Sequence, residues 1–174
     1  MHAENIFVIG LMAVGKSTVG RLLADVLDRP FVDSDHEIEA RAGAEISWIF
    51  DVEGEEGFRD REEQVIDELS QCQGLVVATG GGVVKRKANR DHLAARGVVL
   101  YLDCPIDKLL ERTSRDKHRP LLAGPDREDV LRKLMCERSP LYAEIADYRF
   151  VSGDSSPKQL VQTIVNTLER DGVL

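Results

Sequence analysis

The sequence is poor in three features that mark common classes of protein: basic charge, paired cysteines and long apolar runs. Its 23 Lys and Arg residues are outnumbered by 31 Asp and Glu residues, for a formal net charge of −8. This balance argues against a general nucleic-acid-binding protein, whose surface would be basic. No stretch approaches the ~20 apolar residues of a membrane-spanning helix, and we expect no signal peptide. We therefore expect neither nucleic acid nor a membrane as a partner.

The three cysteines, Cys72, Cys104 and Cys136, lie far apart and form no Cys-x-x-Cys pair. An odd number with this spacing argues against a disulfide framework and against a zinc site. Reduced thiols are typical of the cytoplasm, where disulfides are rare. The sequence therefore predicts a cytoplasmic protein.

No internal repeat and no low-complexity linker divides the chain, so we expect a single domain spanning residues 1–174. Apolar runs rich in β-branched residues alternate with helical patterns, and such runs are typical of a parallel sheet covered on both faces. In the last helical pattern, residues 156–170, Pro157 suits the first turn. The alternation predicts a three-layer α/β fold with right-handed crossovers, whose strands are residues 6–10, 30–33, 74–80, 97–103 and 148–152.

Residues 10–18, GLMAVGKST, match the Walker A pattern GxxxxGK[ST] between an apolar strand and a helical pattern. Glycines let the backbone curl so that its N–H groups face phosphate oxygens, and the start of the helix adds a positive dipole. Lys16 would then contact the β- and γ-phosphates, and the Ser17 hydroxyl would bind Mg²⁺. The alternative is a glycine-rich turn with an incidental lysine, but the two flanks favour the phosphate-binding loop (P-loop).

Other motifs narrow the class of P-loop protein. A GTPase would also carry an NKxD motif, which the chain lacks, and its one DxxG match, at residues 51–54, follows a helical pattern rather than a strand. We interpret that match as a coincidence. An ATPase motor would normally be longer. The remaining class is a small-molecule or nucleotide kinase.

Two aspartates follow the second predicted strand in the segment FVDSD. We expect Asp33 and Asp35 to point to the same side because side chains alternate along a strand. Ligands of open parallel sheets bind at the carboxyl ends of the strands, and phosphoryl transfer to an alcohol needs one carboxylate beside Mg²⁺ and one at the hydroxyl. The alternative is a pair of solvated aspartates in a turn or at a helix N-terminus.

Arg59 and a run of three glycines each allow two interpretations. Arg59 lies in the acidic segment GFRDREEQVIDEL, where an exposed arginine could simply pair with Glu55 or Glu63. The run Gly80-Gly81-Gly82 ends the third predicted strand, either as a loose turn or as bare backbone against which a substrate lies.

The longest loop candidate runs from about residue 113 to 126, where proline and glycine residues interrupt the helical pattern. It carries a cluster of basic side chains in an otherwise acidic chain, made of Arg115, Lys117, His118 and Arg119. This cluster is either a solvated charged surface or part of a mobile lid over a triphosphate.

The segments GLMAVGKSTVGRLLA, FVDSD, GFRDREE, TGGGVV, HRPLLAGPD and ERSPLY occur in the order and approximate spacing of shikimate kinases. The resemblance covers residues 5 to 150, and its later motifs are more specific than the P-loop. It implies a P-loop fold like that of nucleoside monophosphate kinases, with a five-stranded parallel sheet in the order 2-3-1-4-5. It also implies phosphorylation of the 3-hydroxyl of shikimate with MgATP, on the way to chorismate and the aromatic amino acids.

The resemblance also implies roles for individual residues. Lys16, Asp35 and Arg119 would be catalytic, with Asp35 the candidate base and Arg119 reaching from the lid to the transferred phosphate. Mg²⁺ would be held by Ser17 and, through water, by Asp33. The implied ATP-binding residues are Leu11, Met12, Ala13, Val14, Gly15, Lys16, Ser17, Thr18 and Arg119.

The resemblance implies that residues 33–62 form the first part of the shikimate-binding region. The ring hydroxyls of shikimate would contact Asp35, and its carboxylate would be held by Arg59 and Arg138, because planar guanidinium groups suit a carboxylate. The run Gly80, Gly81 and Gly82 would also line the substrate, and the Gly81 amide would donate a hydrogen bond to it.

One region departs from the family pattern. Residues 152–159, SGDSSPKQ, stand where relatives carry a loop that contacts adenine, and we assign no adenine contact there. The competing interpretations are a gluconate kinase of the same fold, which should lack the paired arginines, and a nucleotide-binding protein without catalysis, which should lack Lys16 or Asp35. No extended apolar element suggests a dimer, so we expect a monomer.

Overall fold

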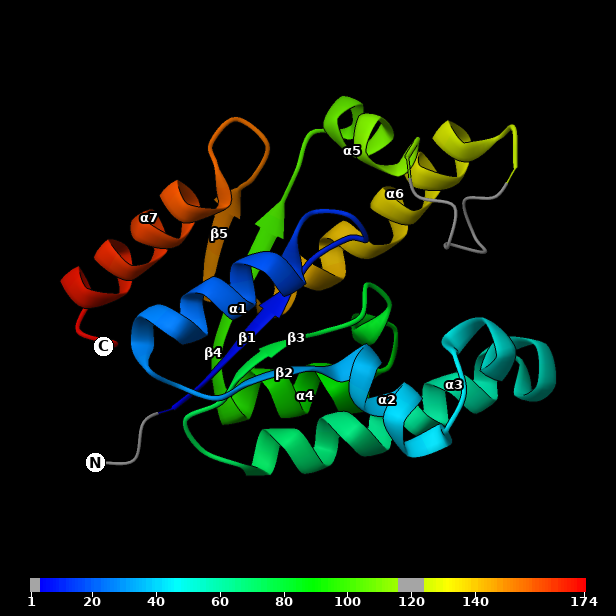
Figure 1. The fold of residues 1–174 in the computed structure, drawn as a ribbon, viewed down its shortest axis with the longest axis horizontal. Helices are drawn as coiled ribbons and strands as arrows, with labels where there is room; N and C mark the ends of the chain where they lie inside the picture. Colours follow the sequence, from blue (N-terminus) through cyan, green and yellow to red (C-terminus); the bar gives the residue numbers. More distant parts are fainter. Residues whose placement is uncertain (1–3, 116–123) are drawn as a thin grey trace.

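The computed structural model describes residues 4–115 and 124–174. Five parallel strands form one sheet in the order β2-β3-β1-β4-β5 (Figure 1), so the predicted order 2-3-1-4-5 is confirmed. The strands are β1 Asn5–Ile9, β2 Phe31–Asp33, β3 Val76–Ala78, β4 Gly97–Asp103 and β5 Tyr148–Val151.

The central strands are continuous apolar runs because helices cover them on both faces. Every residue of β1 is buried, and it pairs with β3 through Ile6 and Val76 and with β4 through Ile6 and Val98. The edge strand β5 instead alternates, with Tyr148 and Phe150 partly buried and the residues between and after them exposed. This difference follows from its place at the edge, where one side is solvated.

Helices cover both faces of the sheet (Figure 1). The chain runs from β1 through α1 towards the β2 edge of the sheet, and it runs in the opposite direction from β2 through α3 to β3 and from β3 through α4 to β4. Because all of these crossovers are right-handed, α1 lies on one face of the sheet and α3 and α4 lie on the other. Helix α1 packs against α7, and α3 packs against α4. The helices are α1 Lys16–Leu27, α2 Ser34–Ala42, α3 Ile46–Gln71, α4 Lys87–Arg96, α5 Ile106–Thr113, α6 Arg127–Ile145, α7 Pro157–Arg170 and the short 3₁₀-helix η1 Val83–Lys85.

Helix α7 begins where the sequence predicts. The Ser156 side chain accepts from the Gln159 amide, the Gln159 side chain accepts from the Ser156 amide, and Pro157 fills the first helical position. This capping box satisfies amides that the first turn leaves unpaired. One face of the helix is buried against the core, through Leu160, Val161, Ile164, Val165 and Leu168.

Helix α3 is broken at Gly54, whose φ of 72° and ψ of 179° are not helical. An L-residue with a side chain would be strained at this φ, so glycine is suited to the break. The DxxG match at residues 51–54 lies in this helix and not at the end of a strand. The break lets the first part of α3 diverge from the part that packs on α4.

No helix in residues 4–115 or 124–174 has the length and apolar character needed to cross a membrane. Cys72, Cys104 and Cys136 are all free thiols, as expected, and Cys104 alone of the three is buried.

Candidate active site

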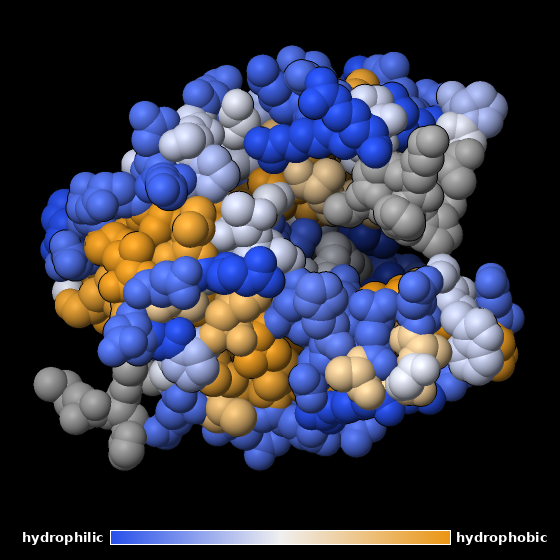
Figure 2. Space-filling model, viewed as in Figure 1, coloured by the Kyte–Doolittle hydropathy of each residue, from blue (hydrophilic) through white to orange (hydrophobic). Residues whose placement is uncertain are grey.

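A pocket of about 930 Å³ opens at the carboxyl ends of β1, β2 and β3. It lies between the P-loop on one side and α2 and α3 on the other, and Figure 2 shows the molecular surface hollowed there. Such a position at the carboxyl ends of parallel strands is where open α/β sheets bind ligands. Most of the predicted site residues line it: Met12, Ala13, Gly15, Lys16, Ser17, Thr18, Asp33, Asp35, Arg59, Gly80, Gly81, Gly82 and Arg138. Leu11 and Val14 are buried behind it.

The P-loop connects β1 to α1 through left-handed backbone conformations. Positive φ angles occur at Gly10 (149°), Ala13 (65°) and Gly15 (99°), and a Cβ at Gly10 would collide with the carbonyl oxygen of Leu102. Helix α1 begins at Lys16, whose Nζ donates to the carbonyl oxygens of Gly10 at 2.8 Å and Leu11 at 2.7 Å. The loop is thus curled around the lysine, and the amide end of α1 opens towards the pocket, as phosphate binding requires.

Ser17 and Asp33 lie side by side, because the Ser17 hydroxyl donates to Asp33 Oδ2. The other oxygen of Asp33 caps α2, accepting from the amides of Asp35 at 3.0 Å and His36 at 3.3 Å. A hydroxyl and a carboxylate side by side are oxygen ligands of the kind that Mg²⁺ prefers, and Mg²⁺ usually takes one or two protein ligands together with phosphates and water. The described residues contain no cluster of three or more potential His, Cys, Asp or Glu ligands, which is compatible with such a site.

Asp35 is partly buried in the pocket, near Lys16 of the P-loop and Glu62 of α3. One of its oxygens, Oδ1, is fully buried and has no hydrogen-bond partner in residues 4–115 or 124–174. Burial, then Glu62, then Asp33 raise the pKa of Asp35 to about 6, although Lys16 and Arg59 act in the opposite direction. A carboxyl group in the pocket whose pKa lies close to neutrality is suited to exchange a proton with a bound ligand.

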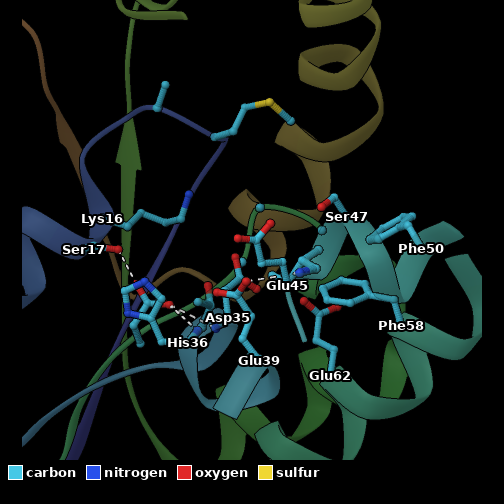
Figure 3. A pocket seen from close by; sticks show the side chains of 18 of the residues that line it. Lys16, Ser17, Asp35, His36, Glu39, Glu45, Ser47, Phe50, Phe58 and Glu62 are labelled. Carbon is cyan, nitrogen blue, oxygen red and sulfur yellow. Dashed lines mark hydrogen bonds between the residues drawn. The ribbon is translucent and has the colours of Figure 1, made fainter. Parts of the chain in front are cut away.

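Arg59 is 6% exposed, so the expected alternative of an exposed arginine is wrong. Its Nη1 donates to Glu62 Oε1 at 2.7 Å, and its Nε lies 3.5 Å from Glu55 Oε1. The other oxygen of Glu62, Oε2, has no hydrogen-bond partner in the described ranges. Burial raises the pKa of Glu62, while Arg59 acts against that rise. The ion pairs with Glu62 and Glu55 thus hold the Arg59 guanidinium in place at the wall of the pocket. Figure 3 shows Glu62 and Asp35 among the side chains that line this pocket.

The three glycines after β3 lie close to other groups of the pocket. They form a turn, in which the Val83 amide donates to the carbonyl oxygen of Gly80 at 3.2 Å, and none of them has a positive φ. A Cβ on Gly80 would lie 2.6 Å from Asp35 Oδ1, one on Gly82 would lie 2.5 Å from Arg59 Nη1, and one on Gly81 would lie 3.5 Å from Arg138 Nη1. Each glycine therefore faces a different charged side chain of the pocket.

A sequence model of the shikimate kinase family matches residues 12–169. The shikimate kinase of Vibrio parahaemolyticus is 58% identical over 166 residues, which cover 95% of this chain and 96% of that protein. The structure of a shikimate kinase from Acinetobacter baumannii in complex with shikimate superposes with a TM-score of 0.94 at 47% identity, over 97% of this chain and 94% of that one. The chain belongs to the shikimate kinase family.

It is therefore an ATP-binding kinase of the P-loop class. A gluconokinase from Sinorhizobium meliloti also superposes, with a TM-score of 0.59 at 17% identity, and at this identity it shares the fold alone. The paired arginines distinguish the two interpretations, because Arg59 and Arg138 are both buried, both line the pocket and come from different helices, α3 and α6.

The expectation that Asp33 and Asp35 point to the same side of a strand is wrong. Strand β2 ends at Asp33, and Asp35 lies in the first turn of α2, so alternation along a strand does not bring them together. The helix-cap alternative is true of Asp33, which nevertheless lines the pocket through its contact with Ser17. The two carboxyl groups face one pocket because α2 turns back over the carboxyl end of the sheet.

Three contributors to this shikimate kinase site were not predicted from the sequence. Glu62 pairs with Arg59 inside the pocket. Arg112 of α5 donates to the carbonyl oxygens of Ala13 and Val14 at 3.1 Å, which secures the outer side of the P-loop. Tyr142 of α6 donates its phenol proton to the carbonyl oxygen of Gly81. The ERSPLY motif contained Tyr142, but it did not show what the phenol contacts.

The predicted lid, residues 113–126, is only partly described. Thr113 is buried at the end of α5, Arg115 is exposed just after it, and residues 124–126 lead into α6. Lys117, His118 and Arg119 lie outside the described residues. The role of Arg119 and the closure of the lid therefore stay predictions.

Proposed function

We propose that this chain transfers the γ-phosphate of ATP to the 3-hydroxyl of shikimate, giving shikimate 3-phosphate and ADP. The observation that carries the proposal is the pairing of two unlike subsites across one pocket. A curled P-loop with Lys16 faces a recess where the buried Arg59 and Arg138 flank the glycine run. The first subsite suits a triphosphate, and the second suits a small hydroxylated carboxylate.

The ATP phosphates would bind to the amides of the P-loop and to Lys16, whose positive charge stabilises the charge that develops on the transferred group. Mg²⁺ would be held by Ser17 and, through water, by Asp33, and it would supply charge neutralisation between the phosphates. The contact between the Ser17 hydroxyl and Asp33 supports this assignment, because it brings both oxygen ligands to one point of the pocket.

Asp35 would accept a hydrogen bond from the substrate hydroxyl and take its proton as the bond to phosphorus forms. Its pKa of about 6 leaves it mostly ionised at neutral pH while keeping it a better base than an exposed aspartate. Arg59, Arg138 and the Gly81 amide would hold the substrate carboxylate, and Arg119 would contact the transferred phosphate.

The enzyme would act as a monomer in the cytoplasm, on small molecules only. Its three free thiols support a reducing compartment, and its net charge of −8 disfavours nucleic acid as a partner.

A coupled assay of ADP release tests the proposal, with shikimate, gluconate and nucleoside monophosphates offered separately as acceptors. We expect rapid release of ADP when shikimate is the acceptor and not with the other two acceptors. In Lys16→Ala, the rate of release with shikimate should fall by several orders of magnitude. Lys87→Ala is the matched control, because Lys87 is exposed and pairs with Asp91 on its own helix. Release that depends on gluconate or a nucleotide, and not on shikimate, would refute the assignment.

A further inference from the structure

Tyr142 is a fully buried tyrosine beside the glycine run. It lies on α6 with 0% exposure, and its ring packs against Tyr101 with the ring centres 5.2 Å apart. A buried phenol normally needs a hydrogen-bond partner. The phenol donates to the carbonyl oxygen of Gly81 rather than to another group of its own helix.

The same phenol lies beside Arg138, which is one helical turn earlier on α6. Residues four apart in a helix share one face, so the guanidinium and the phenol both approach the glycine run from α6. Burial raises the pKa of Tyr142 well above its ordinary value, although the nearby charge of Arg138 acts against that rise. The phenol therefore keeps its proton at any working pH and donates it to the carbonyl oxygen of Gly81.

The carbonyl oxygen of Gly81 belongs to the peptide group that joins Gly81 to Gly82. Fixing this oxygen fixes the plane of that peptide and hence the direction of the Gly82 N–H. Neither the Gly81 nor the Gly82 amide donates to a protein group within the described part of the chain. These amides flank the same recess as Arg138, since a Cβ on Gly81 would lie 3.5 Å from Arg138 Nη1.

We propose that Tyr142 is a positioning residue that holds the Gly81–Gly82 peptide in a fixed relation to the Arg138 guanidinium, so that Arg138 and the Gly82 N–H, beside the Gly81 amide, engage the substrate carboxylate together. The inference rests on the proposed function, because it takes shikimate as the ligand of this recess. Tyr142 does not touch the substrate. It acts by removing the freedom of a peptide group that does, and preorganised donors lose less entropy on binding.

The test compares Tyr142→Phe with Tyr101→Phe. Both variants lose one hydroxyl from the same aromatic pair and keep the packing. The Tyr101 hydroxyl lies near Ser139 and Asp103 and makes no hydrogen bond to the glycine run within the described part of the chain. We expect Tyr142→Phe to raise the KM for shikimate by about 10-fold or more, because the donors that hold a charged carboxylate would be less well placed. We expect the KM for ATP to stay within about twofold, and Tyr101→Phe to change neither constant.

A second substrate separates positioning from general loosening. Shikimate methyl ester has the same ring hydroxyls but no negative charge. Wild type should prefer shikimate over the ester in kcat/KM, and Tyr142→Phe should lose most of that preference, because it weakens only the carboxylate recess. Thermal unfolding of both variants provides the check on folding.

Each remaining outcome decides the question. A KM for shikimate within twofold of wild type overturns the inference. So does an equal loss with shikimate and its ester, a parallel rise in the KM for ATP, or a variant that does not fold, since each makes the hydroxyl a structural group. Failure of the proposed function looks different, because wild-type protein would then release no ADP in response to shikimate.

Discussion

At the scale of single residues, Asp33 and Asp35 are two positions apart but have different surroundings. Asp33 contacts Ser17 and caps α2, whereas Asp35 has a buried, unpaired oxygen facing the glycine run. We therefore expect Asp35→Asn to reduce kcat sharply while nucleotide binding stays nearly unchanged. Asp33→Asn should instead shift the Mg²⁺ concentration that gives half-maximal rate. Magnesium titrations of kcat measure both effects, and the same response in the two variants would disprove the division of roles.

The raised pKa of Asp35 also predicts how folding stability depends on pH. Between the ordinary value of 3.8 and the folded value of about 6, the folded protein retains a proton that the unfolded chain has released. This group alone therefore makes the free energy of unfolding fall as pH rises through that window. Above pH 6, ionised Asp35 should cost on the order of 2–3 kcal/mol of stability in the ligand-free protein.

Urea unfolding at several pH values between 4 and 7 measures this cost. Asp35→Asn should be more stable than wild type at pH 7, and the difference between the two proteins should shrink towards pH 4. Asp91→Asn is the control, because Asp91 is exposed and pairs with Lys87, so its effect should be small. An Asp35→Asn variant that is no more stable than wild type at pH 7 would show that burial of the ionised carboxylate does not destabilise the folded protein.

At the scale of elements, the sequence was sufficient wherever one face or both faces of an element are buried. Strands β1, β3 and β4 are continuous apolar runs, and α7 carries an apolar stripe behind a capping box, so their patterns are explicit. The sheet order, in contrast, came from the family resemblance, because strand order depends on contacts between distant segments.

The pattern failed where the chain turns at the site. The predicted end of the second strand at residue 33 is confirmed, but the sequence did not show that α2 begins at the next residue, Ser34. Asp33 therefore caps a helix, and Asp35 lies on that helix rather than on an extension of the strand. Nor could the sequence show which acidic neighbour of Arg59 lies inside. That choice depends on the rotation of α3 after its break at Gly54, and it brings Glu62 into the pocket while Glu63 faces Arg86.

The segment between α5 and α6 gives a prediction of its own. Arg112 attaches the end of α5 to the P-loop, so the predicted lid, residues 113–126, starts from a point anchored at the nucleotide site. We expect amide hydrogen exchange in this segment to slow strongly when ADP and shikimate are both bound, because closure excludes water. Arg119→Ala should lower kcat by about 10³-fold, with a much smaller effect on the KM for shikimate.

Exchange measured with ADP alone and with shikimate alone shows whether closure needs both ligands. Residues 160–170 of α7, which do not line the pocket, provide the reference rates. Equal exchange of residues 113–126 with and without the two ligands would contradict the lid, and the role given to Arg119 would be lost with it.

At the scale of the whole molecule, we predict a monomer of 19.4 kDa. Among the described residues, the large apolar side chains with substantial exposure are distributed over α1, α3, β5 and the carboxyl terminus: Val26, Trp48, Val52, Val151 and Leu174. Figure 2 shows apolar areas on the side where α1 and α7 lie, divided by a strip of hydrophilic residues. Light scattering across a range of concentrations measures the mass. Twice the chain mass, reversed by Val26→Asp, would contradict the prediction and locate the interface.

The glycine run has a consequence for inhibitor design. Each of its members faces a charged side chain so closely that an added methyl group at Gly80 or Gly82 would overlap Asp35 or Arg59. An inhibitor that gained its affinity by lying on this bare backbone would contact atoms that no codon change can alter without disturbing the residues that serve the enzyme's own substrate. Resistance through substitutions in this run would therefore also weaken the enzyme, whereas an inhibitor that reaches the exposed lining residues His36 or Glu45 could be evaded by substitutions that leave the substrate contacts intact.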